Sequence, residues 1–207
     1  MIIEFFGEPG SGKTTLLKST ASALGARAVY VRVDSSIEAL ARSLLFALAH
    51  PAKAFFWFAA TVKESRGLFR YKMALVVRSL AAVQKASGVR REVVLIDEGL
   101  LQRVLSVYDR LLSDEEIRRV LAHAHTAERV VVCRGGDFSR FVSEPDRFDS
   151  PRVRAGEEHL RQWIATVRAN ASRIETALEP LGRTIFIDAK EGGAAEALIR
   201  SLGVPLK

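Results

Sequence analysis

Short apolar runs alternate with longer amphipathic stretches along most of the chain. Five of these runs are rich in Val, Ile and Phe, as buried strands are, and they cover residues 2–6, 28–33, 93–96, 129–133 and 184–187. Stretches with helical hydrophobic spacing lie between them. This alternation predicts an α/β fold in which a five-stranded parallel sheet is sandwiched by helices.

The gap between the second and third runs is far longer than one crossover helix needs. Ser36 is expected to cap a first helix within it, Pro51 to begin a second, and Gly67 to precede a third that ends near Gly88. We therefore expect a helical insertion over residues 36–88.

The gap between the fourth and fifth runs divides into two unlike parts. Residues 135–156 combine glycines, prolines and arginines, a composition typical of a mobile loop. Apolar residues then recur at helical spacing over residues 160–178, which predicts a long amphipathic helix with one face on the sheet. A last helix is expected over residues 193–202.

Residues 7–14 read G-E-P-G-S-G-K-T and fill the phosphate-loop pattern G-x-x-x-x-G-K-[S/T] between a strand and a helix. The glycines allow backbone N–H groups to point at phosphate oxygens, and the helix N-terminus adds partial positive charge. Lys13 is expected to contact the β- and γ-phosphates, and Thr14 to bind Mg²⁺ through its hydroxyl. The predicted nucleotide-binding residues are Gly7, Glu8, Pro9, Gly10, Ser11, Gly12, Lys13, Thr14 and Thr15.

Two carboxylates, Asp97 and Glu98, follow the apolar run at residues 93–96. A buried strand places them at its carboxyl end, where ligands bind in open α/β sheets. Asp97 is predicted to orient Mg²⁺ opposite Thr14. Glu98 has two interpretations: it is a general base for water or an acceptor hydroxyl, or it caps the helix that begins at Leu100.

Arginines in and beside residues 135–156 are candidates for charge stabilisation. Guanidinium groups carried by a closing loop can stabilise the negative charge that spreads over a transferring phosphoryl group. Arg140 and Arg147 are the predicted catalytic arginines because they lie within the loop, away from its anchored ends. The alternative is an ordinary solvated basic loop.

The helical insertion contains a second basic group and an aromatic run. Arg66, Arg70 and Arg78 fall near one helical face, which either binds the phosphate of an acceptor or is simply exposed. The apolar residues 55–58 are expected to pack in the core, although they also suit an aromatic wall for a flat ligand.

Composition narrows the class of protein further. The net charge of +7 on 207 residues is spread over several segments, which suits a nucleotide, an acidic substrate or nucleic acid; no nucleic-acid module signature is present. Cys133 stands alone, which excludes an internal disulfide and favours a small buried side chain. Neither a transmembrane run nor a signal-peptide pattern is present. We expect a single cytoplasmic domain over residues 1–207, of unassigned oligomeric state.

The layout as a whole resembles the nucleotide and nucleoside kinase group of P-loop NTPases over nearly the full chain, although only the phosphate loop is a specific motif. The resemblance implies Mg-ATP as donor, with Lys13 and Thr14 on its phosphates and metal and an acid at Asp97. It also implies that lid arginines come from the segment between Arg134 and Arg154. From the residues themselves we expect the helical insertion to bind the acceptor, residues 135–156 to form the lid, and the acceptor to be anionic. Asp97 is followed by Glu98-Gly99, and not by the Asp-Arg of thymidylate kinases or the Asp-Gly-Phe-Pro-Arg of adenylate kinases. The identity of the acceptor therefore does not follow.

The adjacent Asp97-Glu98 pair is also similar to the motif of hydrolytic ATPases, in which the glutamate activates water. An ATPase that switches conformation or drives a partner is therefore the alternative to a kinase, and a nucleotide-binding regulator without turnover is a third class. Acceptor-dependent formation of ADP separates the first class from the other two.

Overall fold

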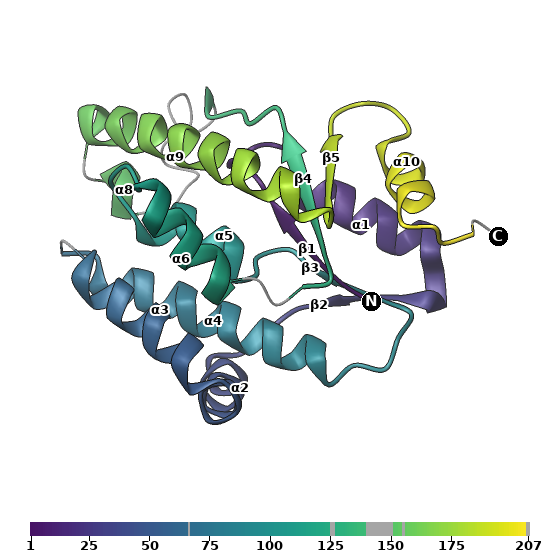
Figure 1. Ribbon diagram of the computed structural model, residues 1–207, viewed down its shortest axis with the longest axis horizontal. Helices are drawn as coiled ribbons and strands as arrows, with labels where there is room; N and C mark the ends of the chain where they lie inside the picture. Colours follow the sequence, from purple (N-terminus) through teal and green to yellow (C-terminus); the bar gives the residue numbers. More distant parts are fainter. Residues whose placement is uncertain (66, 125–126, 140–150, 155, 206–207) are drawn as a thin grey trace.

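The computed structural model describes residues 1–65, 67–124, 127–139, 151–154 and 156–205. Within this part of the chain, five parallel strands form one sheet in the order β2-β3-β1-β4-β5 (Figure 1). They are β1 (Ile2–Phe6), β2 (Ala28–Val31), β3 (Val93–Ile96), β4 (Arg129–Arg134) and β5 (Thr184–Asp188). The predicted strands and their parallel arrangement are confirmed.

The strand order places the two sequence motifs side by side. β1 lies at the centre of the sheet and pairs with β3 on one side and β4 on the other. In the pairing with β3, Glu4 is opposite Ile96. The loop that follows β1 and the carboxylates that follow β3 therefore meet at the same edge of the sheet.

Helices cover both faces of the sheet (Figure 1). They are α1 (Lys13–Leu24), α2 (Ser36–Ala49), α3 (Pro51–Lys63), α4 (Phe69–Ser87), α5 (Leu100–Val107), α6 (Asp114–Ala124), α8 (Pro151–Arg154), α9 (Glu157–Leu178) and α10 (Ala194–Ser201), with 3₁₀ turns at Gly25–Arg27 and Glu179–Leu181. Among the described residues, no helix is long and apolar enough to span a membrane.

Alternate residues of the strands face two separate hydrophobic clusters. On one face of β1, Ile3 and Phe5 pack in a cluster with residues of α1 and α10, and Cys133 is buried in the same cluster. On the opposite face, Phe6 packs in a larger cluster that includes residues of α3 to α6 and α9. Burial raises the pKa of Cys133 to about 12, as expected for a small buried thiol in place of a nucleophile.

The three helices expected between the second and third strands are present, with one correction at their start. The cap of α2 is Ser35, whose Oγ accepts a hydrogen bond from the backbone N of Glu38 at 3.0 Å. Ser36 is instead the first residue of the helix. A capping side chain accepts a hydrogen bond from the backbone N three residues later, and it is Ser35 that makes this bond, with Glu38.

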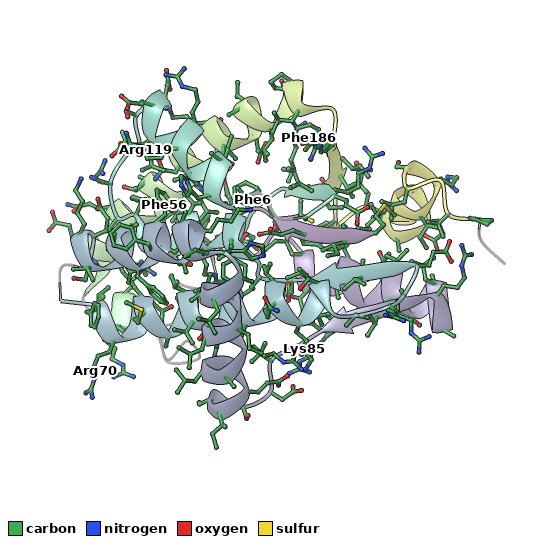
Figure 2. The ribbon with its side chains drawn as sticks, turned by 60° about the horizontal axis from the view of Figure 1, so that its bottom comes forward. Phe6, Phe56, Arg70, Lys85, Arg119 and Phe186 are labelled. Carbon is green, nitrogen blue, oxygen red and sulfur yellow. The ribbon has the colours of Figure 1, made fainter. Side chains whose placement is uncertain are left out.

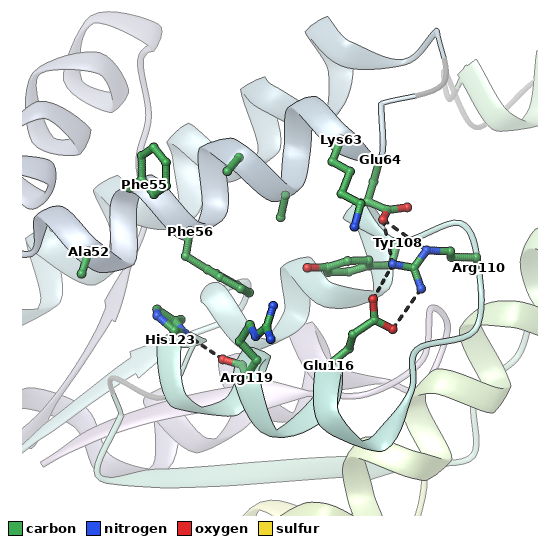
Figure 3. A pocket seen from close by; sticks show the side chains of 12 residues that line it. Ala52, Phe55, Phe56, Lys63, Glu64, Tyr108, Arg110, Glu116, Arg119 and His123 are labelled. Carbon is green, nitrogen blue, oxygen red and sulfur yellow. Dashed lines mark hydrogen bonds and ion pairs between the residues drawn. The ribbon is translucent and has the colours of Figure 1, made fainter.

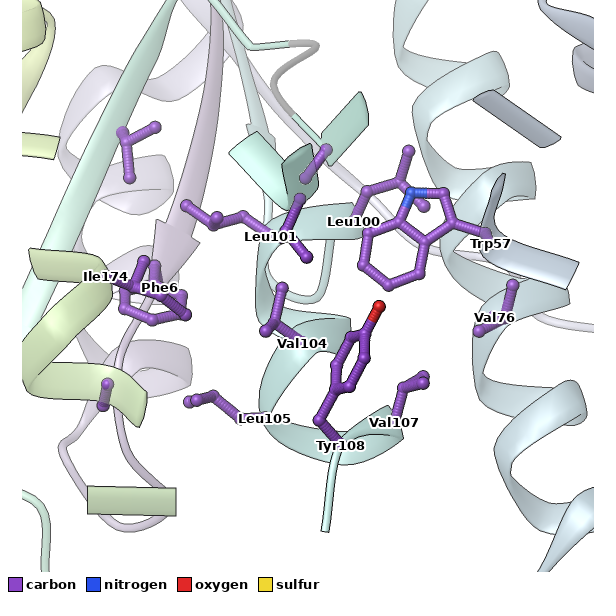
Figure 4. Close-up of a cluster of buried hydrophobic side chains, with 14 of the residues drawn as sticks. Phe6, Trp57, Val76, Leu100, Leu101, Val104, Leu105, Val107, Tyr108 and Ile174 are labelled. Atoms are coloured by element: carbon purple, nitrogen blue, oxygen red, sulfur yellow. The ribbon is translucent and has the colours of Figure 1, made fainter. Parts of the chain in front are cut away.

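The aromatic run at residues 55–58 is divided between core and surface. Trp57 is fully buried and packs against Val76, Leu100 and Tyr108 (Figure 4). Phe55, two residues earlier, is 74% exposed. The expectation of core packing therefore holds for Trp57 and not for Phe55.

Glu4 is a buried carboxyl in the middle of β1, and it fixes the start of α5. Its Oε1 accepts hydrogen bonds from the backbone N of Leu101 at 2.7 Å and of Gln102 at 3.2 Å. The N-cap residue of α5 is Gly99, which has no side chain to accept hydrogen bonds from the first amides of the helix. The distant Glu4 carboxyl accepts them instead. A Cβ on Gly99 would lie 2.4 Å from Glu4 Cδ, so a larger residue does not fit there.

This arrangement settles one of the two interpretations of Glu98. The amides of the first turn of α5 bond to Glu4, and Glu98 does not cap the helix. The capping interpretation is therefore wrong.

Replacing Glu4 by Gln is expected to stabilise the protein at neutral and alkaline pH. Burial raises the pKa of Glu4 from 4.5 to about 7, against the opposing effect of its two backbone hydrogen bonds and of Arg103. Since the folded state then holds the proton more tightly than the unfolded chain, the unfolding free energy of the wild type falls as pH rises between these values. Gln keeps an acceptor oxygen without the buried charge.

Urea unfolding of both proteins from pH 4.5 to pH 8 is the measurement. We expect the stability advantage of Glu4→Gln to grow by about 3 kcal/mol over this range. Glu191→Gln, at an exposed position, serves as the control. A stability advantage of Glu4→Gln that does not change with pH would contradict a raised pKa of Glu4.

Candidate functional site

The phosphate loop packs tightly against the end of β4 and the segment that follows it. Gly7 and Gly10 have φ values of 150° and 75°, in the region that favours glycine. A Cβ on Gly10 would lie 2.1 Å from the backbone O of Asp137, and one on Gly7 would lie 2.3 Å from the backbone O of Cys133. Close packing, as well as backbone geometry, therefore requires glycine at both positions.

Lys13 lies across this loop. Its Nζ donates hydrogen bonds to the backbone O of Gly7 at 2.9 Å and of Glu8 at 2.7 Å, and lies 3.4 Å from Ser11 Oγ. Burial lowers the pKa of Lys13, although Cys133 and the carboxylates of Asp97 and Glu98 act in the opposite direction. The ammonium group is thus held at the loop by backbone carbonyls.

Asp97 and Thr14 meet as the sequence predicts. Thr14 Oγ1 donates to Asp97 Oδ2 at 2.7 Å, and the Tyr30 hydroxyl lies 3.5 Å from the same oxygen. Asp97 Oδ1 is buried and has no hydrogen-bond partner among the described residues. Burial raises the pKa of Asp97, while the Thr14 hydrogen bond opposes the shift.

This pair of side chains fits a magnesium ion. A buried carboxylate oxygen without a protein partner needs a cation or a water molecule, and Mg²⁺ binds one or two carboxylates together with hydroxyl, water and phosphate oxygens. The binding of Mg²⁺ by Thr14 and Asp97 stays a prediction that this geometry fits.

Glu98 is tied to two helices. Its Oε2 lies 2.7 Å from an Nη of Arg103, which is buried on α5, and its backbone O accepts a hydrogen bond from Ser79 Oγ of α4 at 2.8 Å. The Glu98 side chain itself is 62% exposed. The carboxylate is therefore accessible but held in direction by Arg103.

Two cavities meet at Asp97 and Glu98. The first, which we call the loop pocket, has a volume of about 620 Å³ and is lined by Pro9, Gly10, Gly12, Lys13, Thr14, Thr15, Asp97, Glu98, Asp137 and Lys190. The second, which we call the arginine pocket, has a volume of about 190 Å³ and is lined by Tyr30, Val31, Arg32, Val33, Leu75, Arg78, Ser79, Ala82, Ile96, Asp97, Glu98 and Arg103. The two carboxylates separate an anion-binding loop from a cavity with three guanidinium groups.

Three predicted nucleotide-binding residues lie outside the lining of the loop pocket. Gly7 and Ser11 are buried beneath it, and the Glu8 carboxylate points toward Arg168, at 3.8 Å. The backbone N of Gly7 donates to Gln102 Oε1 at 3.1 Å, a contact that links the loop to α5.

The segment predicted as a lid is described only at its ends. Arg140 and Arg147, the predicted catalytic arginines, lie outside the described residues. Arg134 lies 3.4 Å from Glu175 and its guanidinium covers the ring of Phe186. Arg152 is buried, 2.7 Å from Asp109. The ends are anchored, and the catalytic role of the arginines between them stays a prediction.

The arginines of the helical insertion do not act as one group. Arg66 lies outside the described residues, and Arg70 is exposed and points away from the molecule (Figure 2). Of the two described arginines, Arg78 lines the arginine pocket and Arg70 does not, because the eight residues between them rotate the side chain by about 80° around the helix.

Phe55 and Phe56, from the aromatic run at residues 55–58, line a different cavity, between α3 and α6 (Figure 3). This cavity has a volume of about 460 Å³; Phe56 stacks on His123 there, with ring centroids 4.3 Å apart. In the described part of the chain it shares no lining residue with the loop or arginine pocket. Phe55 and Phe56 therefore lie apart from the loop and arginine pockets, and an aromatic wall for a flat ligand stays a prediction.

Sequence reasoning missed Glu4, Gln102, Arg103 and Tyr30. A charged residue within the apolar run at residues 2–6 was the available signal for Glu4. Arg103 and Tyr30 reach the site only through the pairing of β3 with β2 and the direction of α5, and no local pattern marks them.

Comparisons with known proteins agree with this architecture. A deoxyadenosine kinase from M. mycoides with bound dATP is similar with a TM-score of 0.58 and 12% identity, over 98% of this chain and 100% of that chain. The structure of a deoxyadenosine kinase from M. mycoides with bound dCTP has a TM-score of 0.54 and 14% identity, over 98% of this chain and 99% of that chain. At such identities the likeness shows the fold alone. Among curated proteins, none matches the chain in sequence.

The resemblance in fold to nucleoside kinases is thus confirmed. Residues 1–132 match the family model described as an AAA domain, which spans the phosphate loop and the Asp97-Glu98 pair. Since this match covers more than half of the chain, the protein belongs to the AAA domain family and is a P-loop NTPase.

Proposed function

We propose that the protein is a phosphotransferase that moves the γ-phosphoryl group of Mg-ATP to a nucleotide, nucleoside or metabolite acceptor. The arginine pocket favours the anionic members of this group, which are nucleotides and phosphorylated metabolites. The observation that carries the proposal is that Asp97 and Glu98 line the loop pocket and the arginine pocket together. A donor and an acceptor in these two cavities meet at the carboxylates, as a direct transfer requires.

The loop pocket suits the triphosphate of the donor. Backbone N–H groups of the loop and the N-terminus of α1 attract phosphate oxygens, and Lys13 adds a full positive charge. Thr14 and Asp97 would hold the magnesium ion, which when bound neutralises charge on the β- and γ-phosphates.

The arginine pocket suits an acceptor that carries negative charge. Arg78 and Arg103 lie at the same cavity as Glu98, and Arg103 Nε is buried without a hydrogen-bond partner among the described residues. An acceptor anion on these guanidinium groups would place its hydroxyl beside Glu98. Guanidinium groups bind carboxylate and phosphate through paired hydrogen bonds.

Glu98 is the proposed general base. As the acceptor oxygen bonds to the γ-phosphorus, the bond from that phosphorus to the β–γ bridging oxygen breaks and ADP leaves. The acceptor proton passes to the Glu98 carboxylate. The ion pair with Arg103 directs this carboxylate toward the arginine pocket.

Hydrolysis of ATP is the second candidate. It is favoured by the AAA domain match and by the position of Glu98, which lines the loop pocket as well as the arginine pocket. In this alternative Glu98 activates water, and ADP forms at the same rate with or without an acceptor.

Lys13→Ala is expected to lower ATP turnover by at least about 100-fold, because it removes a fixed charge from the transferring group. Thr14→Ala is expected to raise the Mg²⁺ concentration needed for half-maximal turnover. Lys18→Ala, exposed on the same helix, is the control. Steady-state ADP release at varied Mg²⁺ measures both effects, and wild-type turnover in Lys13→Ala would refute the assignment of the loop.

Glu98→Gln is expected to lower acceptor-dependent ADP release by about 100-fold or more while leaving ATP affinity unchanged, since Gln cannot accept the proton. The assay compares nucleosides, nucleotides and phosphorylated metabolites with an acceptor-free reaction. ADP release that no acceptor increases would support hydrolysis and reject the transferase. Full transfer in Glu98→Gln would remove Glu98 as the base.

Arg78→Ala is expected to raise the KM for the best acceptor by about 10- to 100-fold, the effect of losing one charged hydrogen bond, with the KM for ATP unchanged. Arg70→Ala, on the same helix but outside the arginine pocket, should leave both values at wild type. If the two variants behave alike, the arginine pocket is not the acceptor site.

A further inference from the structure

The outward face of α2 is apolar along its whole length. Five large side chains on this helix are more than half exposed: Ile37 (83%), Leu40 (57%), Leu44 (57%), Leu45 (54%) and Leu48 (81%). Ala41, also exposed, lies among them. The charged side chains of the helix lie beside this face, where Glu38 pairs with Arg42 and with Lys85 of α4, each at 2.8 Å.

The inner face of α2 is less apolar than the outer one. Its buried residues are Ala39, Ser43 and Phe46, which face the rest of the molecule. The helix lies on the outside of the molecule beside α4: Figure 1 shows it nearly end-on and Figure 2 shows it along its length. Four leucines and Ile37 thus point to solvent, whereas Phe46 is the one large apolar side chain of this helix that is buried. A surface helix usually buries its large apolar residues.

The exposed apolar area is large for a protein that remains a monomer. The five side chains expose roughly 600 Å², the upper end of the largest apolar patch on a typical monomer. Two such faces together provide roughly 1,200 Å², the lower end of the area buried in a stable protein interface. A second copy of the chain therefore supplies enough surface to form a dimer of modest affinity.

The spacing of the apolar positions is symmetrical, which suits a second copy of the same helix. Positions 37, 40, 41, 44, 45 and 48 are arranged evenly about a point between residues 42 and 43. When two copies of the helix run antiparallel about that point, Ile37 faces Leu48 and Leu40 faces Leu45. Ala41 then faces Leu44, small against large, so that the helices can approach closely. Such a surface is complementary to itself, as a two-fold interface requires.

We propose that α2 is a dimer interface in which it pairs antiparallel with α2 of a second copy of the chain. A membrane surface is a poorer occupant, because helices that lie on membranes carry many Lys and Arg on their polar face. The charged residues of α2 are Glu38 and Arg42, which already pair with each other.

Sedimentation velocity of the full chain tests the proposal. Over a range from about 1 to 100 µM, the span that reports a micromolar dissociation constant, we expect the wild type to change from monomer to dimer. Leu44→Asp is expected to remain a monomer. Leu111→Asp, at an equally exposed leucine outside α2 (56%), is expected to dimerise like the wild type. Circular dichroism confirms that each variant is folded.

Cysteine cross-linking tests the direction of the helices. A mixture of Ile37→Cys and Leu48→Cys proteins is expected to form an intermolecular disulfide, whereas each variant alone is not, because antiparallel pairing separates identical positions by about 16 Å. Cys133 is buried and serves as an unreactive internal reference.

Three results would overturn the proposal. In the first, the wild type stays monomeric at the highest concentration. In the second, the Leu44→Asp protein still dimerises. In the third, each cysteine variant alone forms an intermolecular disulfide between identical positions. A monomer that binds anionic phosphatidylserine vesicles, and loses this binding in Leu44→Asp, would assign the face to a membrane instead.

Discussion

The hydrogen bonds from the first turn of α5 to the Glu4 carboxyl are the contact on which the candidate site depends. Gln102 and Arg103 lie in that turn: Gln102 bonds to the backbone of Gly7, and Arg103 pairs with Glu98. One buried carboxyl on the central strand therefore sets the position of the phosphate loop and of Glu98 at once. An apolar residue at this position would leave two amides of α5 unsatisfied.

Charge is arranged in two unlike compartments on either side of Asp97 and Glu98. In the loop pocket, positive charge comes from Lys13, Lys190 and backbone dipoles, which suit the oxygens of a polyphosphate chain. In the arginine pocket, it comes from guanidinium groups, which suit planar or tetrahedral anions through directed hydrogen bonds. Because the hydrogen-bond donors differ, we expect the two cavities to bind different ligands, even though they share two carboxylates.

The sequence predicted those parts of the molecule whose cause is local. The strands follow from short apolar runs, and the phosphate loop follows from glycines at fixed spacing before Lys13. The meeting of Thr14 with Asp97 was predictable as well, because parallel strands bring their carboxyl ends to one edge of the sheet.

The parts that depend on contacts between distant segments were not predictable. One interpretation of the sequence assigns Glu98 a capping role, whereas the amides of α5 bond to Glu4, 94 residues earlier in the chain. Arg70 and Arg78 were grouped by spacing alone, yet only Arg78 reaches the site, because the rotation of the helix separates them. Ser35 and Ser36 are chemically identical, and the sequence does not distinguish which of them precedes the first helical turn.

The position of Lys13 across the phosphate loop has a consequence for ligand selection. Its ammonium already has two backbone carbonyls as partners, at 2.9 and 2.7 Å. A ligand that draws the ammonium away must replace these bonds with phosphate oxygens of its own, and an anion too short to reach it leaves Lys13 where it is. If the loop binds nucleotides as proposed, this position of Lys13 would make the length of the polyphosphate chain, and not merely its charge, a property by which the loop distinguishes one nucleotide from another.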